Sequence, residues 1–392
     1  MLAKSLTLVV LAASLTAQAG GLDRQRQNEL KQTLRQSLLA NKLDAAVAAI
    51  AELATGDDKA CALVLLGLAH NSPPRVWDAA RDGLASMSSP EVDMLLSRKC
   101  TRARPEEQLL VADALRVRGG SFAELSLVQL LESQDPRIVR AALVALQRAE
   151  LTGARGAVEG WLSGAGAEHP ARLLGQRVLH VLSGGEAGEA APGPSCAGQP
   201  LLGGEVVFVL DASQAMAQDG RFARAKQAIL DAIATLSPEQ RFTVLAYAGK
   251  VREGLAEPEL EKGRYPLAIE GTPWLWSLGP RVEFAKGLWL DKARAWLDGL
   301  TLAETDEAFA LRAVEAALDV PLVDTVVLIS SGRFSDVDHG AGARYPGEAL
   351  PGAVQAANRM KRAVIDVRCF PGGDPALERL ATESGGTFAP LE

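Results

Sequence analysis

The chain has 392 residues, a charged fraction of 23% and a net charge of −7, which are ordinary values for a globular protein with more than one core. The negative charge lies in the second part, where residues 184–392 hold 20 Lys and Arg against 29 Asp and Glu. Because no run of Lys or Arg stands out, we expect no nucleic-acid partner.

The N-terminal stretch MLAKSLTLVVLAASLTAQAG has the pattern of a secretory signal. Lys4 precedes an apolar run, and the small-residue motif Ala17-Gln18-Ala19 follows it. We therefore predict that residues 1–19 are a signal peptide, with a first buried helix as the alternative. The run is too short to span a bilayer, so we expect no membrane insertion after cleavage. The mature protein would be exported, to the periplasm or out of the cell.

Four similar segments follow, and they begin at Leu43, Pro74, Pro105 and Pro136. They read LDAAVAAIAEL, PRVWDAARDGL, PEEQLLVADAL and PRIVRAALVAL, and each begins 31 residues after the one before it. Proline suits the first turn of a helix, where its missing N–H has no helical partner. The segments predict four helices, and apolar segments between them predict a second helix in each period.

A fixed period of two short helices is typical of an α-solenoid. The polar stretch 23–39 is predicted to be an N-terminal capping helix. The segment DPRIVRAALVALQRAE resembles HEAT-like repeats, and we assign residues 20–183 to such a domain. The resemblance implies a surface that binds a protein partner, although a plain helical spacer is the alternative.

Residues 184–203 are rich in Gly, Pro and Ala and predict a flexible linker. The chain has four cysteines, and an exported protein could pair them in two disulfides. Pairing within each half is the simplest scheme, and four buried free thiols are the alternative; the sequence does not decide between them. The four are Cys61, Cys100, Cys196 and Cys369.

From residue 204 onward, strand and helix patterns alternate. EVVFVL, RFTVLAYA, DTVVLIS, VIDVRCF and GTFAPL read as strands, with helical segments between them, and KVREGL reads as a short edge strand. A continuous apolar run indicates a strand that is buried on both faces. Alternating strands and helices predict a doubly wound, mostly parallel sheet, whose ligands bind beyond the carboxyl ends of its strands.

The stretches VVFVLDASQAM, RFTVLAYA, VDTVVLISSG and LERLATESGGTF resemble, in order, the landmarks of a von Willebrand factor A-type (VWA) domain. The resemblance covers residues 204–392 and implies a metal-ion-dependent adhesion site. Asp211, Ser213 and Thr305 match the residues that bind metal in the family. Ala215 stands where the family has a second Ser, and Ser331 stands where it has an Asp.

These two departures remove a hydroxyl oxygen and a carboxylate from the expected site. Mg²⁺ requires several oxygen ligands in near-octahedral geometry, and one carboxylate attracts it less than two. We therefore predict a degenerate site that holds no metal and a protein without a cofactor. The alternative is a rebuilt site that binds Mg²⁺ weakly with help from acidic residues in neighbouring loops, namely Asp219, Glu304, Asp306 or Asp336.

Four of the six tryptophans lie between Trp274 and Trp296. Trp274 and Trp276 fall in a segment flanked by Gly and Pro, which we interpret as a loop. Exposed there, they would form an anchor for a protein partner. Packing in the core is the alternative.

Sequence motifs of catalysis are scarce, with no H-E-x-x-H and no G-x-S-x-G pattern. We therefore expect an exported, non-enzymatic protein that combines a helical-repeat platform with a VWA-like binding module and binds a protein partner. The alternative function is a Mg²⁺-dependent adhesion or ligand-binding module.

Overall fold

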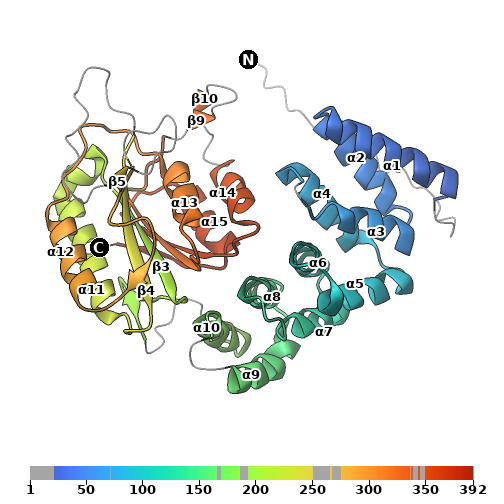
Figure 1. Cartoon of the computed structure of the whole chain (residues 1–392), viewed down its shortest axis with the longest axis horizontal. Helices are drawn as coiled ribbons and strands as arrows, with labels where there is room; N and C mark the ends of the chain where they lie inside the picture. Colours follow the sequence, from blue (N-terminus) through green and yellow to red (C-terminus); the bar gives the residue numbers. More distant parts are fainter. Residues whose placement is uncertain are drawn as a thin grey trace, which may run out of the picture.

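The computed structural model contains a helical region followed by a region built on a sheet (Figure 1). Helices α1 to α10 form a curved array, and the last helices of the sheet region face that array. The structure describes residues 22–70, 72–165, 169–185, 193–249, 265–266, 275–335, 337–338, 343–344 and 349–391.

Five helices form one row of the array, in which each helix contacts the next. Four of them begin at the four residues that the 31-residue period picks out, so this part of the helical prediction is confirmed. Proline opens three of them at a position where a helix needs no N–H donor. The row consists of α2 (Leu43–Ala54), α4 (Pro74–Ser86), α6 (Pro105–Arg118), α8 (Pro136–Arg148) and α10 (Arg172–Leu182).

The remaining helices of this region each contact one or more helices of that row. Asp23 caps the predicted N-terminal helix by accepting a hydrogen bond from the backbone N–H of Arg26 at 2.8 Å. Contacts between α3, α5 and α7 make a second layer. The helices are α1 (Arg24–Leu39), α3 (Lys59–Gly67), α5 (Pro90–Arg102), α7 (Gly120–Leu130) and α9 (Arg155–Gly164), the last preceded by the short 3₁₀ turn η1 (Thr152–Ala154).

The C-terminal end of the predicted linker contains a short hairpin. Residues 195–200 form the hairpin of β1 (Ser195–Cys196) and β2 (Gln199–Pro200), and β1 packs against helix α11 (Arg221–Thr235). Leu201 and Leu202 are buried. This end of the predicted linker contributes to both cores, since Leu202 belongs to the buried cluster of the helical region and Leu201 to a cluster of the sheet region.

An eight-stranded, mixed sheet forms the second region, and its strands follow the order β12-β11-β8-β3-β4-β6-β5, with β7 paired to β4. Strands β3, β4, β8, β11 and β12 are parallel, and β5, β6 and β7 pair antiparallel. This agrees with the predicted mostly parallel sheet. The strands are β3 (Glu205–Asp211), β4 (Arg241–Tyr247), β5 (Tyr265–Pro266), β6 (Leu275–Ser277), β7 (Glu283–Phe284), β8 (Thr325–Ser330), β11 (Val364–Cys369) and β12 (Phe388–Pro390).

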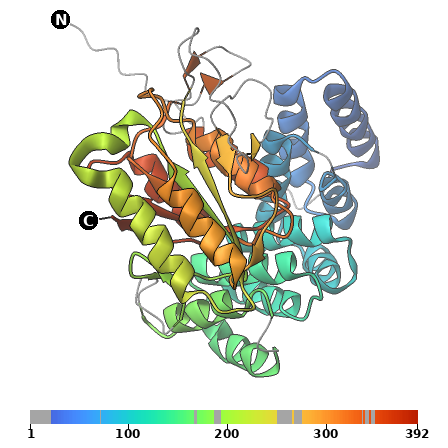
Figure 2. The ribbon, with the colours of Figure 1, turned by 60° about the vertical axis from the view of Figure 1, so that its left-hand side comes forward.

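Helices cover both faces of the sheet (Figure 2). Alternate residues of β3 enter different cores: Val206 and Phe208 pack with α11 and α12 (Leu288–Asp298), and Val207 and Val209 pack with α13 (Ala310–Asp319). The second face is completed by α14 (Leu350–Asn358) and α15 (Pro375–Glu383). Burial on both faces explains why this strand is apolar throughout. A 3₁₀ segment, η2 (Gln214–Gly220), follows β3, and β9 (Val337–Asp338) pairs with β10 (Ala343–Arg344).

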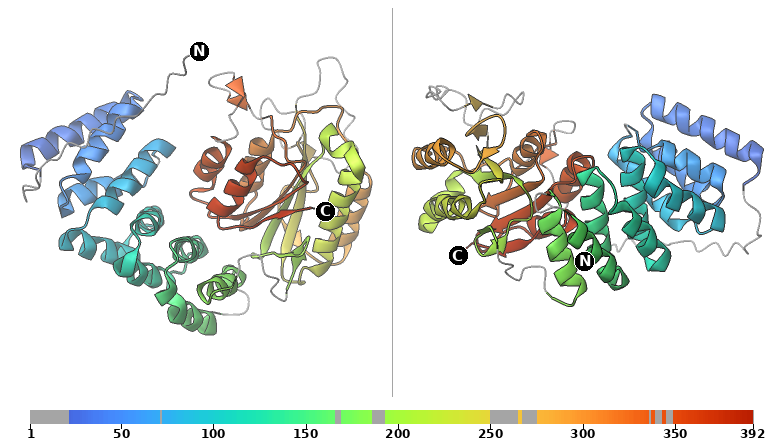
Figure 3. Two further views of the ribbon diagram at one scale, coloured as in Figure 1. Left: turned by 180° about the vertical axis from the view of Figure 1, so that it is seen from behind. Right: turned by 60° about the horizontal axis from the view of Figure 1, so that its bottom comes forward.

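The helical region lies beside the sheet region (Figure 3), and residues of both share one buried cluster. Val364 of β11 belongs to the buried cluster of the helical region, and Met360 packs against that cluster. Gly385, with a φ of +81°, approaches Val144 of α8 so closely that an added Cβ would lie 2.6 Å from the valine Cγ2. Only glycine fits at this contact, which shows that the backbone at Gly385 lies in van der Waals contact with α8.

Some predictions lie outside the described residues, namely the signal peptide and the KVREGL strand at 250–255. The four cysteines are buried free thiols in the structure, and burial is the main cause that raises the pKa of each one above its ordinary value. Among the described residues, no helix is both long enough and apolar enough to cross a bilayer.

Candidate functional site

The carboxyl edge of the sheet brings the sequence-predicted metal residues together, and we call it the sheet crown (residues 211–215, Thr305 and Ser331). Asp211 ends β3 and is fully buried. Its Oδ1 accepts a hydrogen bond from the backbone N–H of Ser213 at 2.9 Å. Its Oδ2 accepts two from Ser331, from the backbone N–H at 3.0 Å and from Oγ at 2.6 Å. Both carboxylate oxygens are thus engaged by donors of the chain itself.

The environment of the Asp211 carboxyl acts on its pKa in two directions. Burial raises the pKa, while the hydrogen bonds from Ser331 and Ser213 lower it, and the net result is a pKa above the ordinary value. The hydrogen bonds therefore offset the effect of burial on the anion only in part. The Asp211 carboxylate is thus stabilised by the dipoles of two backbone N–H groups and one hydroxyl.

Thr305 contacts the loop after β3 through its backbone carbonyl. Its carbonyl accepts a hydrogen bond from the N–H of Gln214 at 2.8 Å, and the carbonyl of Ala303 accepts one from the Gln214 side chain at 3.0 Å. The Thr305 hydroxyl accepts a hydrogen bond from the N–H of Glu307 at 3.2 Å. Thr305 and Asp211 thus both accept from a loop N–H two residues ahead, a structural role for such side chains.

The sheet crown offers few oxygens for a cation. Ala215 is 5% exposed and contributes a methyl group, and Ser331 directs its hydroxyl to Asp211. Among the described residues, no group of three or more His, Cys, Asp or Glu side chains is arranged to hold a metal ion. Asp336, one of the acidic residues that could have rebuilt the site, lies outside the described residues.

The predicted tryptophan anchor falls partly outside the described residues, since Trp274 is among those not described. Trp276 lies in strand β6 and is 7% exposed, so the expectation of a loop is wrong at this residue. Its ring joins the core beneath α11 and α12, as the alternative of core packing has it. Leu275 and Trp276 pair with Tyr247 and Ala246 of β4 in antiparallel register.

A second site lies between the helical region and the sheet region, where a cleft of about 400 Å³ opens. Helices α4, α6 and α8 line one side, and α14 with the segment after it lines the other. Six guanidinium groups converge there, and we call the site the arginine cleft. Its arginines are Arg81, Arg116, Arg140, Arg148, Arg359 and Arg362.

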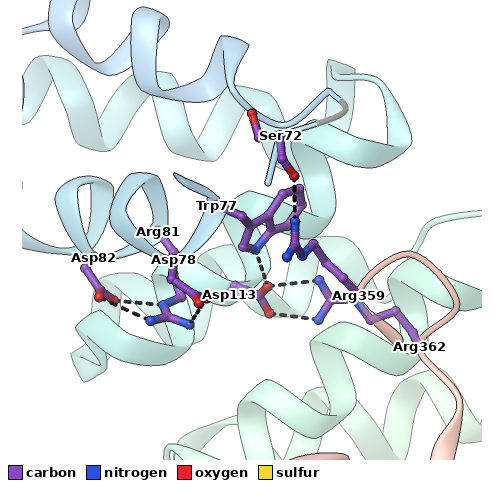
Figure 4. A network of polar contacts seen from close by, with 8 residues as sticks. All are labelled: Ser72, Trp77, Asp78, Arg81, Asp82, Asp113, Arg359 and Arg362. Carbon is purple, nitrogen blue, oxygen red and sulfur yellow. Dashed lines mark hydrogen bonds and ion pairs between the residues drawn. The ribbon is translucent and has the colours of Figure 1, made fainter. Parts of the chain in front are cut away.

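Asp113 of α6 is the central acceptor of the cleft (Figure 4). Its carboxylate receives two hydrogen bonds from Arg362, at 2.8 and 2.9 Å, and one from the indole N–H of Trp77 at 3.1 Å. Burial raises the pKa of Asp113, but the charge and hydrogen bonds of Arg362 lower it by more, so its pKa lies below the ordinary value. This two-point ion pair joins α6 to the segment between α14 and β11.

Other arginines of the cleft donate to backbone carbonyls across the same boundary. Arg359 donates to the carbonyl of Ser72 at 3.1 Å and lies 5.0 Å from the centre of the Trp77 ring. Arg140 donates to the carbonyls of Lys361 and Arg362, at 3.2 and 2.9 Å. These contacts neutralise no charge, because a carbonyl is a dipole and carries no net charge.

The sequence analysis missed the arginine cleft. The six residues come from four separate elements, so no Lys or Arg run marks them. The repeat does not mark them either, because Arg81, Arg116 and Arg148 lie at different distances, 7, 11 and 12 residues, from the first residue of their helices.

No family model matches the sequence, and no curated protein matches it.

Proposed function

We propose that this is an exported, non-enzymatic protein that binds a protein partner through a helical-repeat platform joined to a divergent VWA-like module, and that its binding does not require a metal ion. The observation that supports metal independence is the hydrogen bonding of Asp211. Its two oxygens are occupied by Ser213 and Ser331, so a cation would have to displace donors that already satisfy a buried carboxylate.

The proposed role as a platform draws on the helical region. Its helices are arranged in two contacting layers at a 31-residue spacing, a pattern typical of repeat proteins that present an extended binding surface. Strand order and helix placement in the sheet region are compatible with a VWA-like fold. The binding role itself rests on this analogy of architecture.

A metal titration tests the proposal. The purified full-length protein is titrated with Mg²⁺ and Mn²⁺ while the heat of binding and the melting temperature are followed. We expect no saturable binding in the micromolar range and no rise in melting temperature beyond that of NaCl at equal ionic strength. Micromolar binding that disappears in Asp211→Ala would overturn the proposal and favour the Mg²⁺-dependent module.

Partner capture from an extract of the cell envelope, with and without a chelator, tests the second half of the proposal. We expect the same partner to be retained under both conditions, and retained by Asp211→Asn as well as by the wild type. Loss of the partner on addition of the chelator would contradict metal-independent binding.

A further inference from the structure

The arginine cleft carries more positive than negative charge. Its lining residues include six arginines and three carboxylates, those of Asp78, Asp113 and Glu383, and a fourth carboxylate, that of Asp82, pairs with Arg81, which leaves an excess of two positive charges. The chain as a whole carries a net charge of −7. The excess is therefore a local feature of the boundary between the two regions and is opposite in sign to the rest of the molecule.

Two of the six guanidinium groups have carboxylate partners. Arg81 pairs with Asp78 at 2.8 Å and with Asp82 at 2.8 Å, and Arg362 pairs with Asp113. Both pairs are drawn in Figure 4. These arginines are already balanced, so the excess charge belongs to the other four.

Among those four, three donate to backbone carbonyls and one does not. Arg148 is exposed and donates to the carbonyl of Glu383 at 3.0 Å, while Arg140 and Arg359 hold the boundary as described above. The guanidinium group of Arg116 is half-buried and makes no hydrogen bond or ion pair with any residue that the structure describes. Arg116 thus has five N–H donors available to a ligand in the cleft.

Electrostatics at Arg116 point in the same direction. Burial lowers the pKa of its guanidinium group, and the charges of Arg148, Arg81 and Arg362 lower it further, whereas Asp113 raises it. The cation is therefore in a position that like charges and partial desolvation make unfavourable. An anion next to Arg116 and Arg148 would remove this penalty.

The shape and chemistry of the cleft restrict the ligand. A volume of about 400 Å³ is that of a site for a small molecule or a short side-chain-sized group. The planar fork of arginine matches the two oxygens of a carboxylate or a phosphate and binds them through parallel hydrogen bonds. The excess of two positive charges favours a ligand with more than one negative charge.

We propose that the arginine cleft binds a small polyvalent oxyanion, bearing carboxylate or phosphate groups, with Arg116 and Arg148 as its direct ligands. Arg81 and Arg362 remain paired with their own carboxylates and attract the anion only through their electrostatic potential. The site goes beyond the proposed partner binding and is separate from the sheet crown. Because the cleft lies between two regions, a bound anion would also join them more firmly.

Isothermal titration of the full-length protein at constant ionic strength tests the site with two probes, pyrophosphate and citrate. We expect one saturable site for at least one probe, and whichever probe binds more tightly identifies the source of the oxyanion as phosphate or carboxylate. Arg116→Gln and Arg148→Gln should each weaken binding tenfold or more. The control Arg98→Gln changes an exposed arginine on α5, outside the cleft, and should leave the affinity unchanged.

A second measurement covers the case in which a glutamine variant does not fold. Arg116→Lys keeps the charge but loses the fork, and it should bind more weakly than the wild type. In addition, the wild type should melt at a higher temperature with the bound probe than in NaCl of equal ionic strength. Absence of saturable binding by both probes, or equal affinity in the wild type and the two glutamine variants, would overturn the proposal.

Discussion

The sheet crown and the arginine cleft surround a carboxylate in opposite ways, the fully buried Asp211 at the crown and the half-buried Asp113 in the cleft. At the crown, Asp211 is surrounded by uncharged donors, and its pKa is raised by burial. In the cleft, Asp113 faces a guanidinium group that lowers its pKa, and further guanidinium groups remain without a carboxylate. The difference shows that the carboxylate of Asp211 serves the packing of the core, whereas charge available for a ligand lies at the boundary between the two regions.

This comparison predicts that removal of the Asp113 carboxylate from the ion pair of the cleft causes the largest loss of stability. Asp113→Ala leaves Arg362 partly buried without its carboxylate, with only 17% of the arginine side chain exposed. Loss of one partner from such a pair typically costs about 3 kcal/mol in the free energy of unfolding, measured by urea denaturation.

The matched control is Asp44→Ala, which removes an exposed partner of Arg75 on the surface of the helical region. It should change stability little, because exposed ion pairs contribute little. Equal losses for the two variants would show that the cleft pair is no stronger than a surface pair.

At the crown, we expect a smaller loss. Asp211→Ala takes the acceptor from two backbone N–H groups and one hydroxyl, which is unfavourable, but it also removes a buried charge, which is favourable. The net loss should be about 2 kcal/mol, since each unsatisfied buried donor costs about 1–3 kcal/mol. Urea denaturation of both alanine variants under one condition measures the order, and a larger loss for Asp211→Ala than for Asp113→Ala would reverse the comparison.

The pH dependence of stability should have opposite signs at the two sites. Asp113 has a folded pKa below 3.8, so its contribution is present above that pH and is lost as the pH falls through the folded pKa. Asp211 has a folded pKa above 3.8, so its contribution is present below that pH and is lost as the pH rises through the folded pKa.

Denaturation at a series of pH values, compared with Asp113→Asn and Asp211→Asn, separates the two contributions. The stability difference between the wild type and Asp113→Asn should shrink on acidification, and the difference for Asp211→Asn should move the other way. Parallel curves for the two variants would contradict the assignment of opposite shifts.

Much of the helical region could be predicted because its signals are local. Proline at the first turn marks the start of α4, α6 and α8, and the spacing of these prolines gives the repeat. The sheet strands were predicted for the same reason, since EVVFVL and DTVVLIS are apolar throughout. Such patterns depend on neighbours along the chain.

The sites could be predicted only in part. The motif placed Asp211, Ser213 and Ser331 together, but whether Ser331 would face a cation or donate to Asp211 depends on three-dimensional geometry. Trp276 was assigned to a loop because Gly and Pro flank it, yet pairing with β4 extends it as a strand. The arginine cleft needs contacts between residues more than 200 positions apart, such as Arg140 with Arg362, which no local pattern encodes.

The contacts at the boundary bear on whether the two regions need a covalent connection to stay associated. Among the described residues, polar links from the helical region reach the sheet region within residues 359–385. Ser72 accepts from Arg359, Asp113 accepts from Arg362, Arg140 donates to the carbonyls of residues 361 and 362, Arg148 donates to the carbonyl of Glu383, and Arg177 donates to the carbonyl of Gly385. A polypeptide cut once near residue 193 would therefore retain its interface. Two separately produced fragments should associate without a covalent bond and could be used as a split protein.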